Sequence, residues 1–225
     1  MHNLRAADKL NLKHSIMDSY QRLLSANKLW ATEKVKAEPE YFNKLINVQT
    51  PEFLWIGCAD SRVPADQLTG TQPGEIFVHR NIANMVVHTD TNLMSVLQYA
   101  VEVLKVKHVL VVGHYHCGGV KAAMGHQDLG LMNKWIRNIK EVYEKHEAEL
   151  DTITEKELKF DRMVELNVQE QVYNLVKTSI IQNEWAKNQF PHLHGWVYDL
   201  HNGLIKPIVE INPNEFPINQ IYRYV

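Results

Sequence analysis

Residues 91–119, TNLMSVLQYAVEVLKVKHVLVVGHYHCGG, decide the fold because a helical pattern runs directly into a strand pattern. Apolar residues recur at helical spacing from Thr91 to Lys105. The following run, HVLVVG at 108–113, is short and largely apolar, as expected for a strand buried on both faces. Similar runs, FLWIG at 53–57 and IFVH at 76–79, precede the helix. This order of strand, helix and strand favours a parallel sheet with crossover helices.

The segments on either side extend this prediction. Residues 12–24 carry an amphipathic helical stripe, a short helix is expected after Pro39, and residues 131–187 are expected to be largely helical. Strands at 195–198 and 204–209 are expected to form an antiparallel hairpin. The predicted fold class is therefore α/β, with a mainly parallel central sheet flanked by helices, an N-terminal helical arm and a C-terminal antiparallel edge strand.

Two local motifs within these segments give finer predictions. Thr154 and Glu157 have the spacing of a capping box at the start of a helix. Asn202-Gly203 is the expected turn of the hairpin.

Because no linker, repeat or low-complexity tract interrupts the chain, a single domain over 1–225 is the simpler division. It comprises a helical arm at 1–50, an α/β core at 51–210 and a tail at 211–225. The arm either packs on its own core or lies over another subunit, and both alternatives stay open at the level of sequence.

Composition limits the partners. The chain has 24 Lys and Arg against 26 Asp and Glu, so its formal net charge of −2 gives no electrostatic case for nucleic acid or an anionic membrane. The apolar runs are far shorter than the roughly 20 residues that span a bilayer. The charged N-terminal segment does not resemble a secretory signal, so we expect a cytoplasmic protein. A reducing compartment favours metal binding or catalysis for the two cysteines over a disulfide.

Both cysteines follow predicted buried strands. Cys58 comes after the first strand and Cys117 after the third, beside His114 and His116. Ligands gather at the carboxyl ends of parallel strands, where these side chains can converge. Two thiolates and one imidazole suit zinc with one open position. Spacing alone does not decide whether His114 or His116 is the nitrogen ligand.

Asp60 and Arg62 lie two residues apart on the loop after Cys58. A bidentate pair with Arg62 would keep Asp60 ionised as a hydrogen-bond acceptor for a zinc-bound water. Released from Arg62, Asp60 could reach the metal itself. The plainer alternative is a surface ion pair worth roughly 0–1 kcal/mol.

Three other uses of these residues compete with a catalytic site. Each cysteine taken alone is more often a small buried hydrophobe. The zinc could serve only the folding of a binding domain. A redox role would use a Cys58–Cys117 disulfide, but the chain has no Cys-x-x-Cys pair.

These motifs resemble the β-class carbonic anhydrases. The Cys-x-Asp-x-Arg motif stands at 58–62 and the His-x-x-Cys motif at 114–117. Further similarity at 73–81, 167–174 and 194–198 extends the resemblance over roughly residues 10 to 210. The resemblance implies one zinc ion per subunit, held by Cys58, His114 and Cys117, with Asp60 and Arg62 as the catalytic dyad. It also implies reversible hydration of carbon dioxide to bicarbonate by zinc-bound hydroxide. The alternative within the same scaffold is hydrolysis of a related electrophile such as carbon disulfide.

The chain also resembles the type II subset of bacterial members of this family. There a non-catalytic bicarbonate site of Trp, Arg and Tyr, matched here by Trp55, Arg80 and Tyr198, is linked to a closed, inactive state in which Asp60 would bind the zinc. The resemblance further implies a homodimer or homotetramer with the arm over a neighbouring subunit. Tyr99 matches a family residue beside the substrate pocket at the dimer interface.

Overall fold

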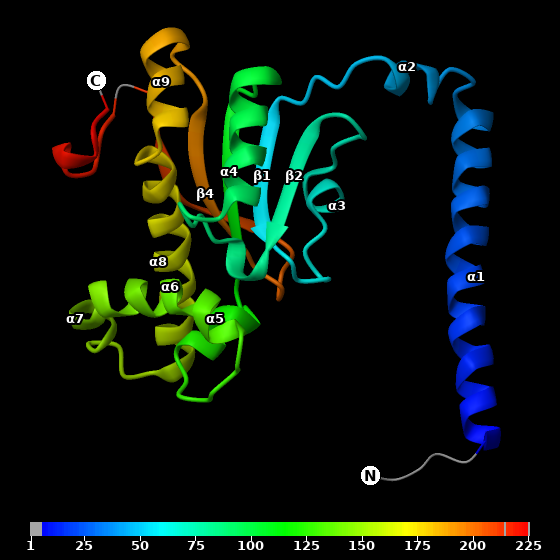
Figure 1. Ribbon diagram of the computed structural model, residues 1–225, viewed down its shortest axis with the longest axis horizontal. Coiled ribbons are helices and arrows are strands. Elements are labelled where there is room, and N and C mark those ends of the chain that lie inside the picture. The colour runs from blue at the N-terminus through cyan, green and yellow to red at the C-terminus, as the bar shows by residue number, and fades with distance from the viewer. Residues whose placement is uncertain (1–5, 214, 225) are drawn as a thin grey trace. The chain divides into compact units, whose positions relative to one another are not determined.

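The computed structural model describes the backbone of residues 6–213 and 215–224 (Figure 1). The chain divides into two compact units, Met1–Val48 and Gln49–Val225. None of the helices in the described ranges is long and apolar enough to cross a membrane.

The N-terminal unit consists of a long helix and a short one. Helix α1 spans Ala6–Ala37 and α2 spans Asn43–Ile46, which confirms both predicted helices. The Trp30 ring meets the rings of Tyr41 and Phe42 edge-on, with centroids 6.3 and 5.7 Å apart. These aromatic contacts hold α2 against the end of α1.

The apolar stripe of α1 is not covered within this unit. Tyr20, Leu23 and Leu24 are all exposed there, whereas the side chains of Leu12 and Ile16 lie outside the described residues. Packing of the stripe on a core of its own unit is therefore not observed for the described part.

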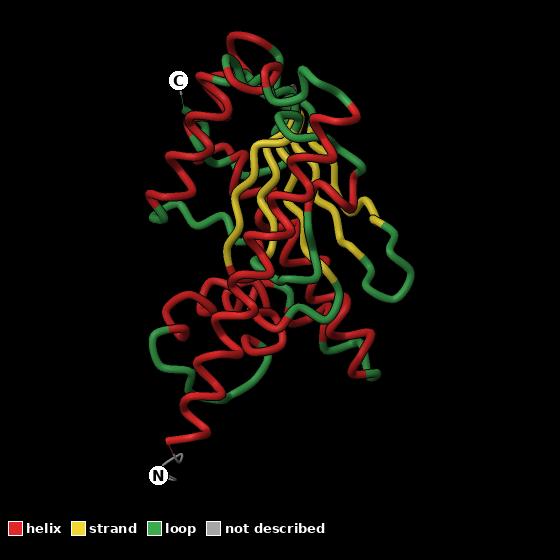
Figure 2. Tube along the Cα trace, turned by 90° about the vertical axis from the view of Figure 1, so that its right-hand side faces the viewer, coloured by secondary structure: helices red, strands yellow, loops and turns green. Residues whose placement is uncertain are grey.

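The C-terminal unit is built on a five-stranded sheet in the order β2-β1-β3-β4-β5. The strands are β1 (Phe53–Cys58), β2 (Ile76–Asn81), β3 (His108–His114), β4 (His192–Tyr198) and β5 (Ile205–Ile211). The first four are parallel, and β5 runs antiparallel to β4. Figure 2 shows the strands side by side. The predicted α/β class and antiparallel edge strand are confirmed.

Helices connect the strands and cover the sheet. They are α3 (Ala65–Thr69), α4 (Thr91–Gln98), α5 (Gly118–Ala123), α6 (Met132–Lys145), α7 (Glu147–Leu150), α8 (Lys156–Val176) and α9 (Ser179–Asn188). Short 3-10 turns lie at η1 (Ile82–Asn84) and η3 (Gln220–Tyr222). The helix predicted from Thr91 continues beyond α4 as a π-helical turn, η2 (Tyr99–Val103).

The two faces of the sheet contribute to separate apolar clusters. Leu54 and Ile56 of β1 belong to the main core, which also contains Val168 and Val172 of α8. Helix α8 packs closely, because a Cβ added at Gly195 would come within 2.9 Å of Val168 and 3.0 Å of Val172. Trp55, Leu110 and Val112 point to the other face and form a smaller cluster with Val63 and Ala65. The sheet is thus buried on both faces, as its apolar runs predict.

The two local motif predictions are wrong. The N-cap of α8 is Glu155, with no side-chain capping hydrogen bond, so Thr154 and Glu157 do not form a capping box. Asn202-Gly203 is not a two-residue turn, because the loop closes more widely through a hydrogen bond from the Asp199 N–H to the Leu204 carbonyl at 2.9 Å. The Asn202 side chain bonds Asp199 and the Leu204 N–H, at 2.8 Å each, and stabilises this wider loop.

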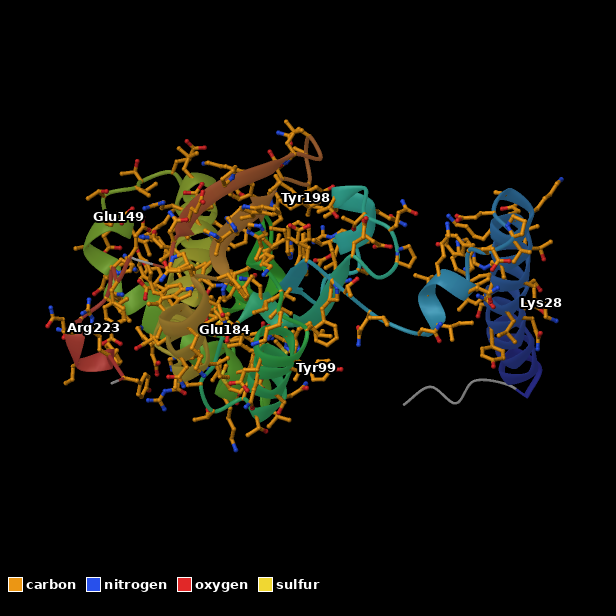
Figure 3. The ribbon with its side chains drawn as sticks, turned by 90° about the horizontal axis from the view of Figure 1, so that it is seen from above. Lys28, Tyr99, Glu149, Glu184, Tyr198 and Arg223 are labelled. Atoms are coloured by element: carbon orange, nitrogen blue, oxygen red, sulfur yellow. The ribbon has the colours of Figure 1, made fainter. Side chains whose placement is uncertain are left out.

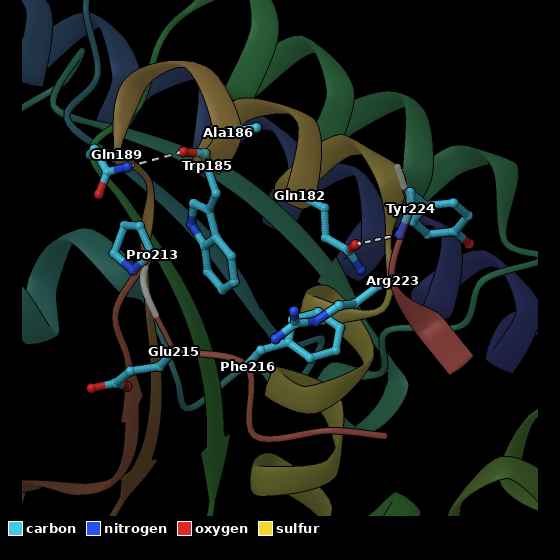
Figure 4. A pocket seen from close by; sticks show the side chains of 9 residues that line it. All are labelled: Gln182, Trp185, Ala186, Gln189, Pro213, Glu215, Phe216, Arg223 and Tyr224. Atoms are coloured by element: carbon cyan, nitrogen blue, oxygen red, sulfur yellow. Dashed lines mark hydrogen bonds between the residues drawn. The ribbon is translucent and has the colours of Figure 1, made fainter. Parts of the chain in front are cut away.

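The C-terminal segment packs against α9. The backbone N–H of Tyr224 donates to Gln182 Oε1 at 3.0 Å, and the Arg223 guanidinium lies over the Phe216 ring at 4.5 Å. Together with Trp185, these residues line a cavity of about 360 Å³ (Figure 4). The segment after β5 is thereby held at the side of the sheet where β4 begins.

Candidate metal centre

Three buried side chains converge at the carboxyl ends of β1 and β3. Cys58 is the last residue of β1, His114 is the last of β3, and Cys117 directly precedes α5. One ligand atom from each lies within 4.8 Å of the other two, and within the described ranges this is the one such group found. The two Sγ atoms are 3.9 Å apart, close to the separation of about 3.8 Å for two thiolates bound 2.3 Å from a tetrahedral zinc ion.

The structure brings His114, and not His116, to the cysteines. The Nδ1 atom of His114 is 2.9 Å from the Tyr115 carbonyl, which leaves Nε2 as the free ligand atom. Nε2 is buried and has no hydrogen-bond partner among the described residues, as expected of a nitrogen that binds a metal. His116 has a left-handed backbone with φ 59°, and its ring lies against that of His201, 4.8 Å between centroids.

Backbone amides prepare the two sulfurs for the charge of a thiolate. The contact between the two thiols lowers the pKa of Cys58, while the same contact and burial raise the pKa of Cys117. The backbone of Ala83 hydrogen-bonds to Cys58, and the backbones of Gly119 and Val120 hydrogen-bond to Cys117. These donors favour the charged forms that a metal requires.

Asp60 lies beside this group and is held by Arg62. Arg62 donates from Nε to Oδ1 at 2.9 Å and from Nη2 to Oδ2 at 2.7 Å, and its backbone N–H also donates to Oδ1 at 2.9 Å. The Arg62 guanidinium therefore holds the pKa of Asp60 well below its usual range. Asp60 Oδ2 is also 3.6 Å from His114 Nε2, so an ionised carboxylate faces the three ligand atoms.

Trp55, Arg80 and Tyr198, the residues matched to a bicarbonate site, share one face of the sheet. The strand register places all three at positions whose side chains point to the same side. Trp55 is fully buried, and its indole N–H has no partner among the described residues. Arg80 donates to the carbonyls of Cys58, at 3.0 Å, and of Asp60. Tyr198 packs against the same apolar cluster as Trp55. Arg80 thus joins this face to the loop that carries Asp60.

Tyr99 lies elsewhere in the C-terminal unit. It opens the turn η2, is 42% exposed and packs at 5.8 Å from the Phe77 ring. Figure 3 shows Tyr99 and Tyr198 well apart. The structure does not bring Tyr99 to the three candidate ligands within the described chain.

The segment after β2 is a part of the site that the sequence did not reveal. Asn81 holds it in place, because its side chain bonds both the N–H and the carbonyl of Met85, at 2.7 and 2.8 Å. This turn presents the backbone of Ala83 to Cys58. A Cβ at Gly119 would come within 2.8 Å of Ile82, so glycine permits α5 to approach the same segment. The paired glycines at 118 and 119 were the signal in the sequence that two segments approach each other closely there.

The sequences of known proteins that this chain resembles agree with the geometry of the three candidate ligands. The carbonic anhydrase family model matches residues 53–205. A carbonic anhydrase of Emericella nidulans is 48% identical over 202 residues, which cover 90% of this chain and 89% of that protein. The chain therefore belongs to the carbonic anhydrase family.

Solved structures place it within the β class of that family. A tetrameric β-carbonic anhydrase of Sordaria macrospora superposes with a TM-score of 0.83 at 39% identity, covering 86% of this chain and 99% of that one. The Coccomyxa β-carbonic anhydrase, solved with acetazolamide, gives a TM-score of 0.81 at 44% identity, covering 84% and 86%. The protein is a zinc-dependent enzyme of reversible carbon dioxide hydration, and its Cys58-His114-Cys117 group fits one zinc ion.

Proposed function

We propose that Cys58, His114 and Cys117 hold the zinc ion and that Asp60 and Arg62 form the catalytic dyad. The observation that carries this assignment is the unpartnered, buried Nε2 of His114 beside two free thiols and an ionised carboxylate. Zinc, when bound, supplies the Lewis acidity that makes water a nucleophile near neutral pH.

Arg62 keeps Asp60 in the state and place that this proposal requires. Because Arg62 keeps its carboxylate ionised, Asp60 accepts a hydrogen bond from the reacting water and orients it toward carbon dioxide. The Arg62 side chain is more exposed than that of Asp60, at 54% against 16%, so Arg62 holds the carboxylate from the side of solvent.

A matched pair of histidine variants tests the ligand assignment. His114→Ala is expected to lose zinc and carbon dioxide hydration together, measured by elemental analysis and stopped flow. His116→Ala, only two residues away, is expected to keep its zinc. Zinc retained in the first variant and lost in the second would reverse the assignment. Carbon disulfide hydrolysis without carbon dioxide hydration would instead support the alternative substrate.

We also propose a bicarbonate-dependent closed state. Trp55 offers an unpartnered indole N–H on the sheet face it shares with Arg80 and Tyr198. Arg80 is bonded to the backbone of the Cys58–Asp60 loop, so bicarbonate bound by Arg80 would draw it away from these carbonyls. The loosened loop would let Asp60 leave Arg62 and join the zinc ligands.

The test of this regulation is bicarbonate inhibition of hydration across pH. Wild type is expected to lose activity below about pH 8 in a bicarbonate-dependent manner. Trp55→Val and Arg80→Ala are expected to weaken that dependence, with Arg137→Ala as a surface control. A wild-type profile that is insensitive to bicarbonate would contradict the closed state.

We propose that residues 1–225 form a single domain with an arm at 1–50, a core at 51–210 and a tail at 211–225. We further propose that its subunits assemble as a homodimer or homotetramer through the arm. The N-terminal unit leaves Tyr20, Leu23 and Leu24 exposed, and an uncovered apolar stripe of this kind marks an interaction surface. The Sordaria macrospora relatives are tetrameric. Tyr99, exposed on η2, would then complete the substrate pocket at a subunit interface.

Sedimentation of the zinc-loaded protein tests assembly. The full chain is expected to sediment as a dimer or tetramer, and Leu23→Glu with Leu24→Glu is expected to shift it toward monomer. A monomeric wild-type chain would contradict the proposal. We also propose a cytoplasmic location, because the two buried cysteines are not joined in a disulfide, as is usual in a reducing compartment.

A further inference from the structure

A second polar cavity lies on the helical side of the C-terminal unit. It has a volume of about 330 Å³ and is formed by α6, α8, the segment after η1, and η3. Lys145, Glu170, Asn174, Lys177 and Tyr222 are among the residues that line it. None of the candidate zinc ligands takes part in it.

Lys177 is the least neutralised cation in this cavity. Its Nζ donates to Asn174 Oδ1 at 3.0 Å and lies 5.3 Å from the centre of the Tyr222 ring. No carboxylate of the described chain forms an ion pair with it. Burial lowers the pKa of Lys177, the positive charge of Lys145 lowers it further, and Glu170 opposes both. An amine in such surroundings is more often neutral and nucleophilic than an exposed lysine.

The carboxylates that face the cavity are already paired. Glu170 accepts from Lys145 at 2.6 Å and lies 3.0 Å from His146 Nε2, while Glu141 pairs with Arg137 at 3.3 Å. Because these partners offset the two negative charges, a new anion at Lys177 would not meet an uncompensated carboxylate. Lys145 uses one of its three N–H donors on Glu170, and it keeps two for another acceptor.

We propose that Lys177 is a reversible carbamylation site for carbon dioxide. The lone pair of the neutral Nζ attacks the carbon of carbon dioxide and forms a C–N bond, while one C=O electron pair moves to oxygen. Nζ then loses one proton to water, so the balance is Lys–NH₂ plus CO₂ giving Lys–NH–COO⁻ plus H⁺. No oxidant or reductant is needed.

The cavity can hold the product. The carbamate keeps one N–H, which maintains the hydrogen bond to Asn174 Oδ1. Its three added heavy atoms are small against a cavity of about 330 Å³. Its charge is placed beside Lys145, which lines the same cavity. This site goes beyond the hydration reaction, because it uses carbon dioxide as a modifying reagent away from the zinc ligands.

The test traps the carbamate on the zinc-loaded full chain. Protein equilibrated with ¹³C-labelled bicarbonate and carbon dioxide at about pH 8, where more of a low-pKa lysine is neutral, is alkylated with triethyloxonium, digested and analysed by mass spectrometry. We expect labelled ethoxycarbonyl on Lys177 at several times the level on exposed Lys187 of α9. Equal or lower labelling of Lys177 would overturn the proposal, whatever the hydration rate.

Two variants define the site further. Lys177→Arg places a side chain of similar length at this position that cannot form the carbamate, so the label must vanish from that peptide while carbon dioxide hydration is unchanged. Lys145→Met is expected to reduce labelling of Lys177 several-fold, with hydration confirming that the variant is folded. Label that persists at position 177 in the first variant, or an undiminished yield in the second, would contradict the assignment.

Discussion

Two groups of side chains that contain imidazoles lie at opposite ends of the same sheet and differ in what the ring nitrogens contact. At the carboxyl ends, His114 Nε2 is buried without a partner among the described residues and shares its surroundings with Cys58 and Cys117. At the amino ends, His108 Nδ1 and His194 Nε2 lie 3.0 Å apart and satisfy each other. The first group needs a ligand, and the second does not.

Histidine content alone does not locate a metal centre. The chain has twelve histidines, and the amino-end group brings together three of them, including His192 with its ring 5.5 Å from His108. Two features separate the carboxyl-end group from it: the thiols of Cys58 at the end of β1 and of Cys117 before α5, and the unpartnered Nε2 of His114. Soft thiolate ligands and a free imidazole nitrogen are what zinc selects.

The largest effect that would test this comparison is removal of a thiol. Cys58→Ser is expected to abolish stoichiometric zinc and to reduce carbon dioxide hydration more than about 100-fold, beyond the loss caused by mutating a residue that only supports a ligand. The matched change at the other end of the sheet, His194→Gln, is expected to retain zinc. Elemental analysis and stopped flow measure both. Zinc retained by Cys58→Ser with normal activity would remove the distinction between the two ends.

The next effect concerns the residue that holds Asp60. Arg62→Ala removes both side-chain hydrogen bonds to the carboxylate, and we expect hydration to fall by about 10- to 100-fold while zinc remains bound. Arg137→Ala breaks an exposed pair with Glu141 and serves as control. If the two variants had the same activity, the Asp60–Arg62 pair would be only a surface ion pair.

A smaller effect is expected from a change at Gly195, which lies in β4 between the two ends of the sheet. Gly195→Ala places a Cβ within 3.0 Å of Val209, Val168 and Val172, so we expect a loss of about 1–3 kcal/mol in the free energy of unfolding with zinc content unchanged. Gly125→Ala, whose Cβ would meet only ordinary contacts at 3.5 Å or more, is the control. Urea unfolding measures both, and equal stabilities would contradict the packing described here.

The smallest effect is the pH response of the amino-end imidazoles. Burial lowers the pKa of His108 and of His194, so the unfolded chain binds more protons than the folded one as the pH falls below about 6.5. The free energy of unfolding is therefore expected to decrease as the pH falls from this value through the lower folded pKa.

A matched pair of variants isolates this contribution. His194→Gln is expected to flatten the pH dependence of urea unfolding relative to wild type, and His126→Gln, at an exposed position, is expected to leave it unchanged. A slope that is unaffected by His194→Gln would show that the pair carries no linked protons.

The sequence predicted the parallel sheet because each buried strand is a short apolar run, and burial on two faces leaves few other conformations for such a run. It failed at Asn202-Gly203, where the hydrogen bonds of the Asn202 side chain to Asp199 and Leu204 outweighed the local turn preference. It also failed at Thr154, because α8 begins one residue later than a cap at Thr154 requires, with Glu155 as its N-cap. Spacing alone did not separate His114 from His116, since the left-handed φ of His116 turns that ring away.

The backbone donors of the site were beyond sequence reasoning for a different reason. Ala83, whose backbone hydrogen-bonds to Cys58, lies 25 positions after it in the chain. A main-chain amide is present in nearly every residue, so no residue type in the sequence indicates this contact. Only the glycines at 118 and 119 hinted that two segments meet there closely.

The antiparallel direction of β5 has a practical consequence for using the enzyme on a solid support. Ile211 at the end of β5 pairs with Leu193 near the start of β4, so the chain leaves the sheet at the end opposite Cys58 and His114. The following residues are then held on α9 by the bond between Tyr224 and Gln182. A bead or electrode attached to this C-terminal segment would leave the end of the sheet that carries Cys58 and His114 open to dissolved carbon dioxide.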